Sequence, residues 1–133
     1  MGTDDVVYID YVQAVTLHFK LMHVWGETRF GIESRDLIES ALARPRHAAN
    51  YEGADIIRQA ATLCFGLIKN HPWTGGNKRT ATLVMDEFLF INGFDLRVES
   101  TDLIDLAIAV ESDIWLVDEI ENWLRSRTTS ISE

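Results

Sequence analysis

Apolar residues recur at helical spacing along nearly the whole chain. The first stretch steps by three and four residues and places one apolar stripe on a helix: Tyr8, Val12, Val15, Phe19 and Met22. Ser34 can cap a second, short helix, which we expect to end before Pro45 because proline disrupts a helix interior. The apolar positions of this second helix are Leu37, Ile38, Ala41 and Leu42.

A third helix, which Asp55 can cap, carries two adjacent apolar stripes. One stripe is Ile56, Ala60, Leu63 and Leu67, and its neighbour is Ile57, Ala61, Cys64 and Ile68. A helix that is apolar over so wide a face is expected to be central and covered by the others. Pro72 prevents this helix from continuing.

Three further helices are predicted after Pro72. The fourth spans about residues 78–92 and ends at Gly93, the fifth opens at Ser100 or Thr101, and the last opens at Ser112.

The remaining segments favour little regular structure. Short extended pieces are expected at residues 6–9 and 94–98, and the polar tail 126–133 is expected to be frayed and disordered. The pattern predicts one domain over residues 1–133, an all-α bundle of about six helices with at most a small β-hairpin.

Composition excludes several classes of protein. Of the 133 residues, 47% are hydrophobic and 25% charged, and 12 Lys and Arg against 21 Asp and Glu give a net charge of −9. Direct nucleic-acid binding and docking on an anionic membrane both favour a basic surface, so we expect neither. The single cysteine, Cys64, cannot form an intrachain disulfide, and the longest apolar stretch, residues 59–68, is too short for a membrane span. We therefore expect a cytoplasmic protein.

Acidic residues gather between Arg97 and Arg125, with no Lys or Arg among them. They are Glu99, Asp102, Asp105, Glu111, Asp113, Asp118, Glu119 and Glu121. We interpret this run as a solvated face rather than a docking surface.

The unusual segment is residues 70–81, between two strongly apolar helices. Its two glycines let backbone N–H groups converge, and the helix that follows presents its N-terminus, which favours anions. Lys78 and Arg79 in the first turn oppose the helix dipole, so a bound anion explains them better than stability does. Histidine titrates near neutral pH, which makes His71 the natural general base. The alternative is a plain turn at Gly75 and Gly76 with His71 capping a helix, which leaves Lys78 and Arg79 unexplained.

The run His71-Pro72-Trp73-Thr74-Gly75-Gly76-Asn77-Lys78-Arg79 resembles the signature of the Fic family. Lys after Asn is typical of its death-on-curing (Doc) branch. The resemblance covers about residues 9–96 and implies a compact Fic-like helical bundle, with residues 44–53 as the flap that aligns a target chain.

The resemblance also implies roles for the loop residues. His71 would be the catalytic base, Trp73 would anchor the loop in the core, and the nucleotide phosphates would lie on Gly75, Gly76, Asn77, Lys78 and Arg79. ATP or another nucleoside triphosphate is the implied substrate, with Mg²⁺. Gly75 stands where the family has its acidic metal ligand, so no residue is a certain ligand.

The Doc branch transfers a phosphate to a threonine of elongation factor Tu and arrests translation, which makes a toxin of a toxin–antitoxin system the implied function. The family's inhibitory motif, Ser/Thr-x-x-x-Glu-Gly/Asn, is missing here, because Ala48 and Val117 occupy the two positions that need a hydroxyl. This points to a separate, cognate antitoxin. Two alternatives stay open: an AMP transferase, and a degenerate Fic fold that acts only as a binding module.

Overall fold

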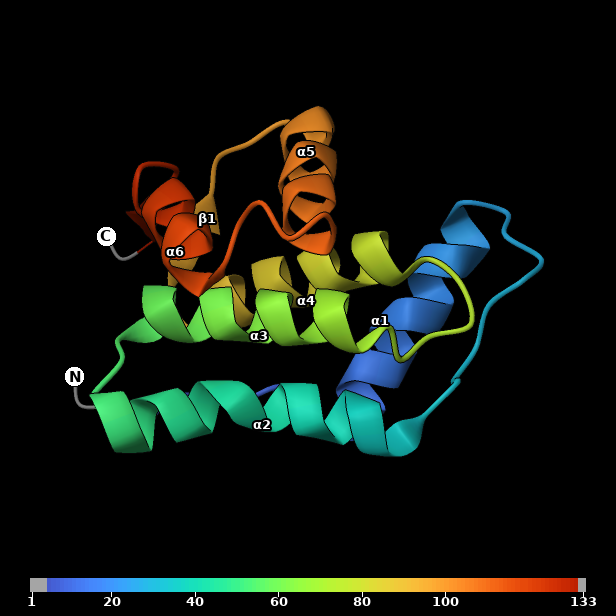
Figure 1. The fold of residues 1–133 in the computed structure, drawn as a ribbon, viewed down its shortest axis with the longest axis horizontal. Helices are drawn as coiled ribbons and strands as arrows, with labels where there is room; N and C mark the ends of the chain where they lie inside the picture. The colour runs from blue at the N-terminus through green and yellow to red at the C-terminus, as the bar shows by residue number, and fades with distance from the viewer. Residues whose placement is uncertain (1–4, 132–133) are drawn as a thin grey trace.

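The computed structural model describes residues 5–131, in which six helices and two short strands follow one another. The elements are α1 (Tyr11–Val24), α2 (Arg35–Glu52), α3 (Ile56–Asn70), α4 (Asn77–Ile91), β1 (Phe94–Leu96), α5 (Ser100–Glu111), α6 (Val117–Arg125) and β2 (Thr128–Ser130). The prediction of a compact all-α bundle of about six helices is confirmed (Figure 1). None of the described helices is long and apolar enough to cross a membrane.

Helix α3 is the centre of the bundle, as its two apolar stripes predict. The side chain of Asp55 caps it by accepting the Arg58 N–H at 3.0 Å, and ten of its 15 residues are buried. Helix α2 runs along one side of α3, while α5 and α6 lie on the opposite side (Figure 1). Each fully buried aliphatic side chain in this core contributes about 1.5–3 kcal/mol.

Helix α2 does not end before Pro45, so that prediction is wrong. The helix continues through Pro45 to Glu52 and ends at Gly53, whose left-handed backbone (φ 67°) donates back to the last turn. Pro45 removes one backbone hydrogen bond but lies on the buried stripe of the helix, between Ala41 and Ala48. Packing of this stripe against α3 offsets the cost of the proline.

Helix α1 buries a face that matches the predicted stripe only in part: Met22 is buried and Val15 packs against the core, as predicted. Its buried residues are Ala14, His18 and Met22, whereas Val12 is 69% and Phe19 is 44% exposed. The sequence stripe was misleading because the residue that fills the core in the middle of this helix is a histidine.

The last helix begins later than expected. Ser112 caps the end of α5 instead of opening α6, and Asp113 adopts a left-handed backbone (φ 65°) that breaks the chain there. Helix α6 starts at Val117. The side chain of Glu119, in its first turn, accepts the N–H of the capping residue Leu116 at 2.7 Å.

The expectation of a frayed tail is wrong for its middle part. Thr128–Ser130 forms β2, which pairs antiparallel with β1 across the intervening α5 and α6 rather than as a hairpin. Residues 132 and 133 lie outside the described residues. The extended piece expected at residues 6–9 joins no described strand; the Asn92 side chain instead bonds both the N–H and the carbonyl of Val7.

Candidate active site

The loop of residues 71–76, between α3 and α4, packs against the strand-like segment that precedes α2. Trp73 and Ile32 form an isolated antiparallel bridge, and the Thr74 N–H donates to the Gly31 carbonyl at 2.9 Å. The loop backbone is therefore fixed on one side by main-chain hydrogen bonds.

Trp73 holds the loop in the core. It is 2% exposed and stacks on the buried His18 ring, with 4.3 Å between the ring centroids. His18 Nε2 accepts the Gly31 N–H at 3.1 Å, so Nδ1 carries the proton and donates to Thr80 Oγ1 at 2.8 Å. The indole Nε1 of Trp73 is buried and has no hydrogen-bond partner within residues 5–131.

Asn77, the first residue of α4, closes the loop. Its Oδ1 accepts the Trp73 N–H at 3.0 Å, and its Nδ2 donates to the Trp73 carbonyl at 2.9 Å. The side chain that the sequence assigns to phosphate binding is thus occupied in holding the loop's shape.

Gly75 lies too close to backbone to carry a side chain, and Gly76 has a backbone conformation that side chains rarely adopt. A Cβ at Gly75 would stand 2.6 Å from the Arg29 carbonyl oxygen, and one at Gly76 would stand 2.5 Å from the end of the Met22 side chain. Gly76 also has the left-handed φ of 66° at the N-cap of α4.

His71 and Lys78 converge on one carboxylate, that of Glu111 at the end of α5. Glu111 Oε2 lies 2.8 Å from His71 Nε2, and Oε1 lies 3.0 Å from Lys78 Nζ. Hydrogen bonds from Lys78 and then from His71 lower the pKa of Glu111, which favours its ionised form. His71 caps α3 with a left-handed backbone (φ 48°), a conformation uncommon for a residue with a side chain.

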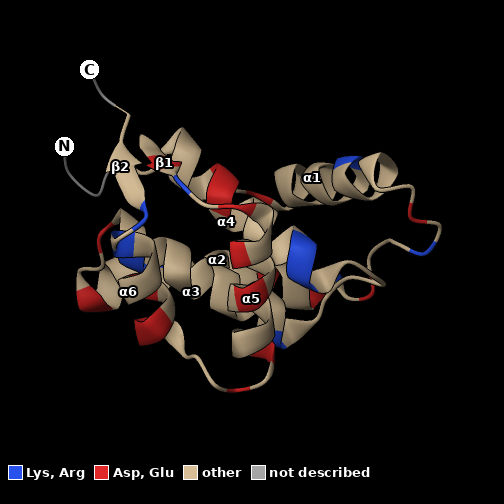
Figure 2. Cartoon of the chain, turned by 90° about the horizontal axis from the view of Figure 1, so that it is seen from above, with Lys and Arg blue, Asp and Glu red and all other residues tan. Residues whose placement is uncertain are grey.

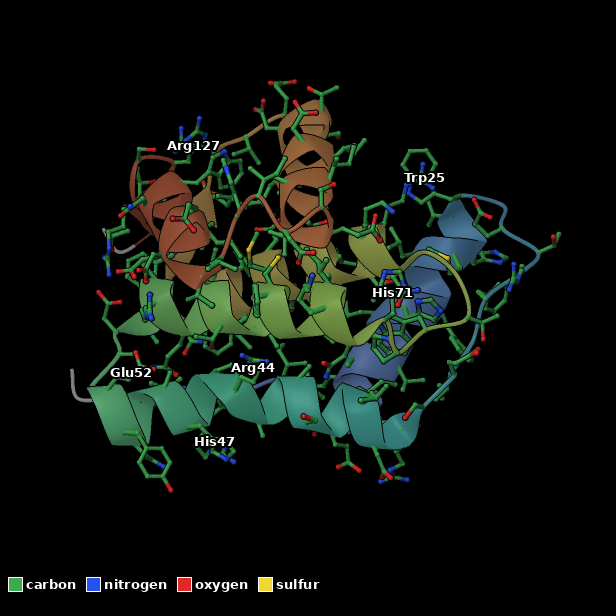
Figure 3. The ribbon with its side chains drawn as sticks, viewed as in Figure 1. Trp25, Arg44, His47, Glu52, His71 and Arg127 are labelled. Atoms are coloured by element: carbon green, nitrogen blue, oxygen red, sulfur yellow. The ribbon has the colours of Figure 1, made fainter. Side chains whose placement is uncertain are left out.

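Arg79 belongs to a different group of side chains. Its guanidinium lies 4.2 Å over the Trp25 ring centroid and 3.7 Å from Glu27 Oε2. Figure 3 shows Trp25 on the outer side of the molecule, with His71 at the loop below it.

Two adjoining cavities follow α4. The first, of about 280 Å³, is lined by Gly76, Asn77, Lys78, Arg79, Thr82, Leu103, Ile104 and Ala107. The second, of about 180 Å³, is lined by Leu21, Trp25, Arg79, Thr82, Leu83, Asp86, Ser100, Leu103 and Ile104. The shared residues make the two cavities one groove between α4 and α5, cationic at the first turn of α4 and apolar along α5.

The loop offers Mg²⁺ no acidic ligand at the position where the resemblance would place one. Position 75 has no carboxylate and no space for one, because the Arg29 carbonyl lies against it. Within residues 5–131, no cluster of three or more His, Cys, Asp or Glu can hold a metal ion.

The segment expected to be the flap, residues 44–53, is the second half of α2 and not a flap. Asn70, at the end of α3, donates to the carbonyl of Leu37 in the first half of α2. Figure 3 accordingly shows Glu52 at the end of α2 that is remote from His71, with Arg44 near the middle of the helix. The segment beside the loop is residues 29–34 instead.

Sequence reasoning missed two residues of the site, Glu111 and His18. Glu111 is one of many acids along α5 and α6, which Figure 2 shows in red, and nothing in the sequence sets it apart from its neighbours. His18 offered one signal: it follows Ala14 and precedes Met22 at steps of four, the spacing of a buried helix face.

Comparisons with known proteins agree on one family. The sequence model of the Fic/DOC family matches residues 8–89. A curated protein of Mycolicibacterium smegmatis, named Toxin Doc, is 38% identical over 82 residues, which are 56% of this chain and 62% of that protein. The chain therefore matches less than two thirds of that relative's length.

Proposed function

Because the chain belongs to the Fic/DOC family, we propose that it transfers a phosphate from ATP or another nucleoside triphosphate to a Thr or Ser hydroxyl of a protein. One observation carries the proposal: His71 and Lys78 share the carboxylate of Glu111, and the groove begins at Lys78. A base and a phosphate-binding cation are the two groups that such a transfer needs side by side.

The proposed step is an in-line displacement at the γ-phosphorus. The target hydroxyl oxygen forms a bond to phosphorus while the bond from phosphorus to the bridging oxygen of the leaving diphosphate breaks. The hydroxyl proton passes to His71. Since Nε2 of His71 bonds to the Glu111 carboxylate, Nε2 carries hydrogen, and the free lone pair of the neutral ring lies on Nδ1.

The phosphates would lie at the first turn of α4. Lys78 supplies a positive charge, and the unpaired N–H groups that follow Gly76 supply aligned donors. The α5 wall of Leu103, Ile104 and Ala107 offers apolar surface for the rest of the nucleotide. No step is assigned to a protein-held Mg²⁺, because residues 5–131 contain no cluster of three or more metal-ligating side chains and position 75 is a glycine.

Glu111 would act as a positioning residue. Its hydrogen bond fixes which nitrogen of His71 carries the proton, and its other oxygen holds Lys78 at the mouth of the groove until a phosphate takes its place.

The protein target would run beside the loop, along residues 29–34. Phe30 and Ile32 are 39% and 40% exposed there, next to the fixed loop backbone. This segment would take the role that the family resemblance implied for residues 44–53.

The likeness to Toxin Doc supports a toxin of a toxin–antitoxin system. Its target would be elongation factor Tu, its effect the arrest of translation in the cytoplasm, and its regulator a cognate antitoxin.

Intact-protein mass spectrometry of elongation factor Tu tests the proposal. The factor is incubated with this protein, Mg²⁺ and either ATP or GTP, and in parallel with His71→Ala. A gain of one phosphate that His71→Ala abolishes is expected. A gain of AMP or GMP would make the protein a nucleotidyl transferase. No gain on elongation factor Tu or on the proteins of a cell extract would leave only a binding module and would overturn the proposal.

A further inference from the structure

Asp86 is a partly buried carboxylate without a hydrogen-bond or ion-pair partner among residues 5–131. It lines the second cavity, yet it forms no hydrogen bond or ion pair with any residue that the structure describes. Burial raises the pKa of the Asp86 carboxyl, and the charges of Asp95 and Glu87 raise it further. A carboxylate placed so receives its hydrogen bonds either from solvent or from a ligand in the cavity, and a ligand that excludes solvent must supply a donor.

Asp86 lies on the same face of α4 as Lys78, which marks the proposed phosphate end of the groove. Lys78, Thr82 and Asp86 follow at steps of four on one face of α4, and Asp86 lies roughly 12 Å along the helix from Lys78. A nucleotide in the groove with its phosphates at Lys78 would extend in this direction.

The second cavity has the walls of a base-binding pocket. Apolar side chains come from three helices (Leu21, Leu83, Leu103 and Ile104), and the Trp25 ring, 55% exposed with Arg79 over its face, forms the rim. Flat rings stack well on such aromatic and guanidinium surfaces. Asp86 is the acceptor that would orient a base among these walls.

We propose that the second cavity takes a nucleobase with two adjacent donors, and that Asp86 thereby selects guanine over adenine. This inference rests on the proposed function and deepens it by naming the nucleotide. The two carboxylate oxygens match N1–H and the N2 amino group of guanine. Adenine presents only one donor beside an unprotonated ring nitrogen, which an ionised carboxylate repels.

A cationic side chain of a protein could also pair with Asp86. The groove favours the base, because Arg79, Thr82, Leu103 and Ile104 line both cavities and join Asp86 to the phosphate end without a break.

Isothermal titration calorimetry on the full chain tests the assignment. The probes are the β,γ-imido analogues of GTP and ATP with Mg²⁺, and inosine triphosphate, which lacks the N2 amino group. We expect the guanosine analogue to bind about ten- to a hundredfold more tightly than the adenosine analogue, with inosine triphosphate between them. Asp86→Asn should bring the two analogues within about threefold of each other.

The matched control is Glu87→Gln, which removes the same charge from the next residue of α4. Glu87 lines neither cavity, so this variant should keep the preference for guanine. Equal binding of both analogues by the parent protein, or an unchanged preference in Asp86→Asn, would overturn the assignment but leave the proposed transferase standing. If no analogue binds, the proposed function falls with it.

Discussion

Trp73 and His18 stack with 4.3 Å between their ring centroids and 14° between their planes. The contact joins the loop of residues 71–76 to α1, and both nitrogens of His18 are engaged, one by Thr80 and one by the Gly31 N–H. His18 is fully buried, and burial lowers the pKa of His18 to about 4.

The protein should therefore lose stability as the pH falls from about 6.5 to 4. In this window the unfolded chain protonates His18 and the folded chain does not, so the free energy of unfolding decreases, by about 3 kcal/mol at most. Urea denaturation followed at several pH values measures this slope.

Carboxylates also titrate in this range, so variants isolate the part of His18. His18→Gln should be less stable at pH 7 and should lose this share of the slope. His23→Gln, at an exposed position of the same helix, should keep the parent slope. Equal slopes in the parent and in His18→Gln would contradict the prediction.

Glu111→Gln should lower kcat for phosphate transfer by about ten- to a hundredfold, because a positioning carboxylate is lost. The KM for the nucleotide should stay the same or fall, since Lys78 is released from its ion pair. If Glu111 had only a structural role, its loss would not lower kcat while leaving KM unchanged or lower. Asp105→Asn, on an exposed face of α5, is the control and should leave both constants unchanged.

Lys78→Ala should weaken the binding of a nucleoside triphosphate by about ten- to a hundredfold, the contribution of one charged hydrogen bond. Calorimetric titration with a β,γ-imido analogue measures the change. Lys69→Ala removes an equal charge from α3, where Lys69 pairs with Asp113, and should bind as the parent does. Similar losses in both variants would mean that general charge, rather than the Lys78 site, attracts the nucleotide.

Gly75→Ala should destabilise the fold by about 1–3 kcal/mol, because its Cβ would meet the Arg29 carbonyl at 2.6 Å. Gly75→Asp should suffer the same clash and should not raise transfer activity, although it restores the family's acid. Thr74→Ala, which adds no atoms, is the control for thermal denaturation. A stable, more active Gly75→Asp protein would show that the loop has room for a metal ligand.

Periodicity predicted the fold well where one helix face decided burial. The double stripe of α3 correctly placed it at the centre, and Asp55 correctly marked its start. Local rules failed where distant packing decided the outcome. Pro45 stays helical because its face is buried against α3, and Thr128–Ser130 forms a strand by pairing with β1, which is distant in the sequence.

The candidate site likewise contains residues that the sequence predicted and residues that only the folded structure brings in. His71 and Lys78 stand in one short segment, so their spacing could be read from the sequence. Glu111 lies 33 residues beyond Lys78, and only the packing of α5 beside α4 brings the two together. The role of Asn77 in bracing Trp73 was equally hidden, because an amide beside glycines is compatible with ligand binding and with a loop brace.

The position of Glu111 on α5 bears on how proteins with the same loop signature come to differ. The match to the family model covers residues 8–89, whereas the carboxylate that bonds His71 and Lys78 lies beyond that range, at the end of α5. Two chains with an identical signature can thus inherit different neighbours for their histidine. Substitutions on α5 alone can therefore change the hydrogen-bond partner of the histidine while every residue of the signature stays the same.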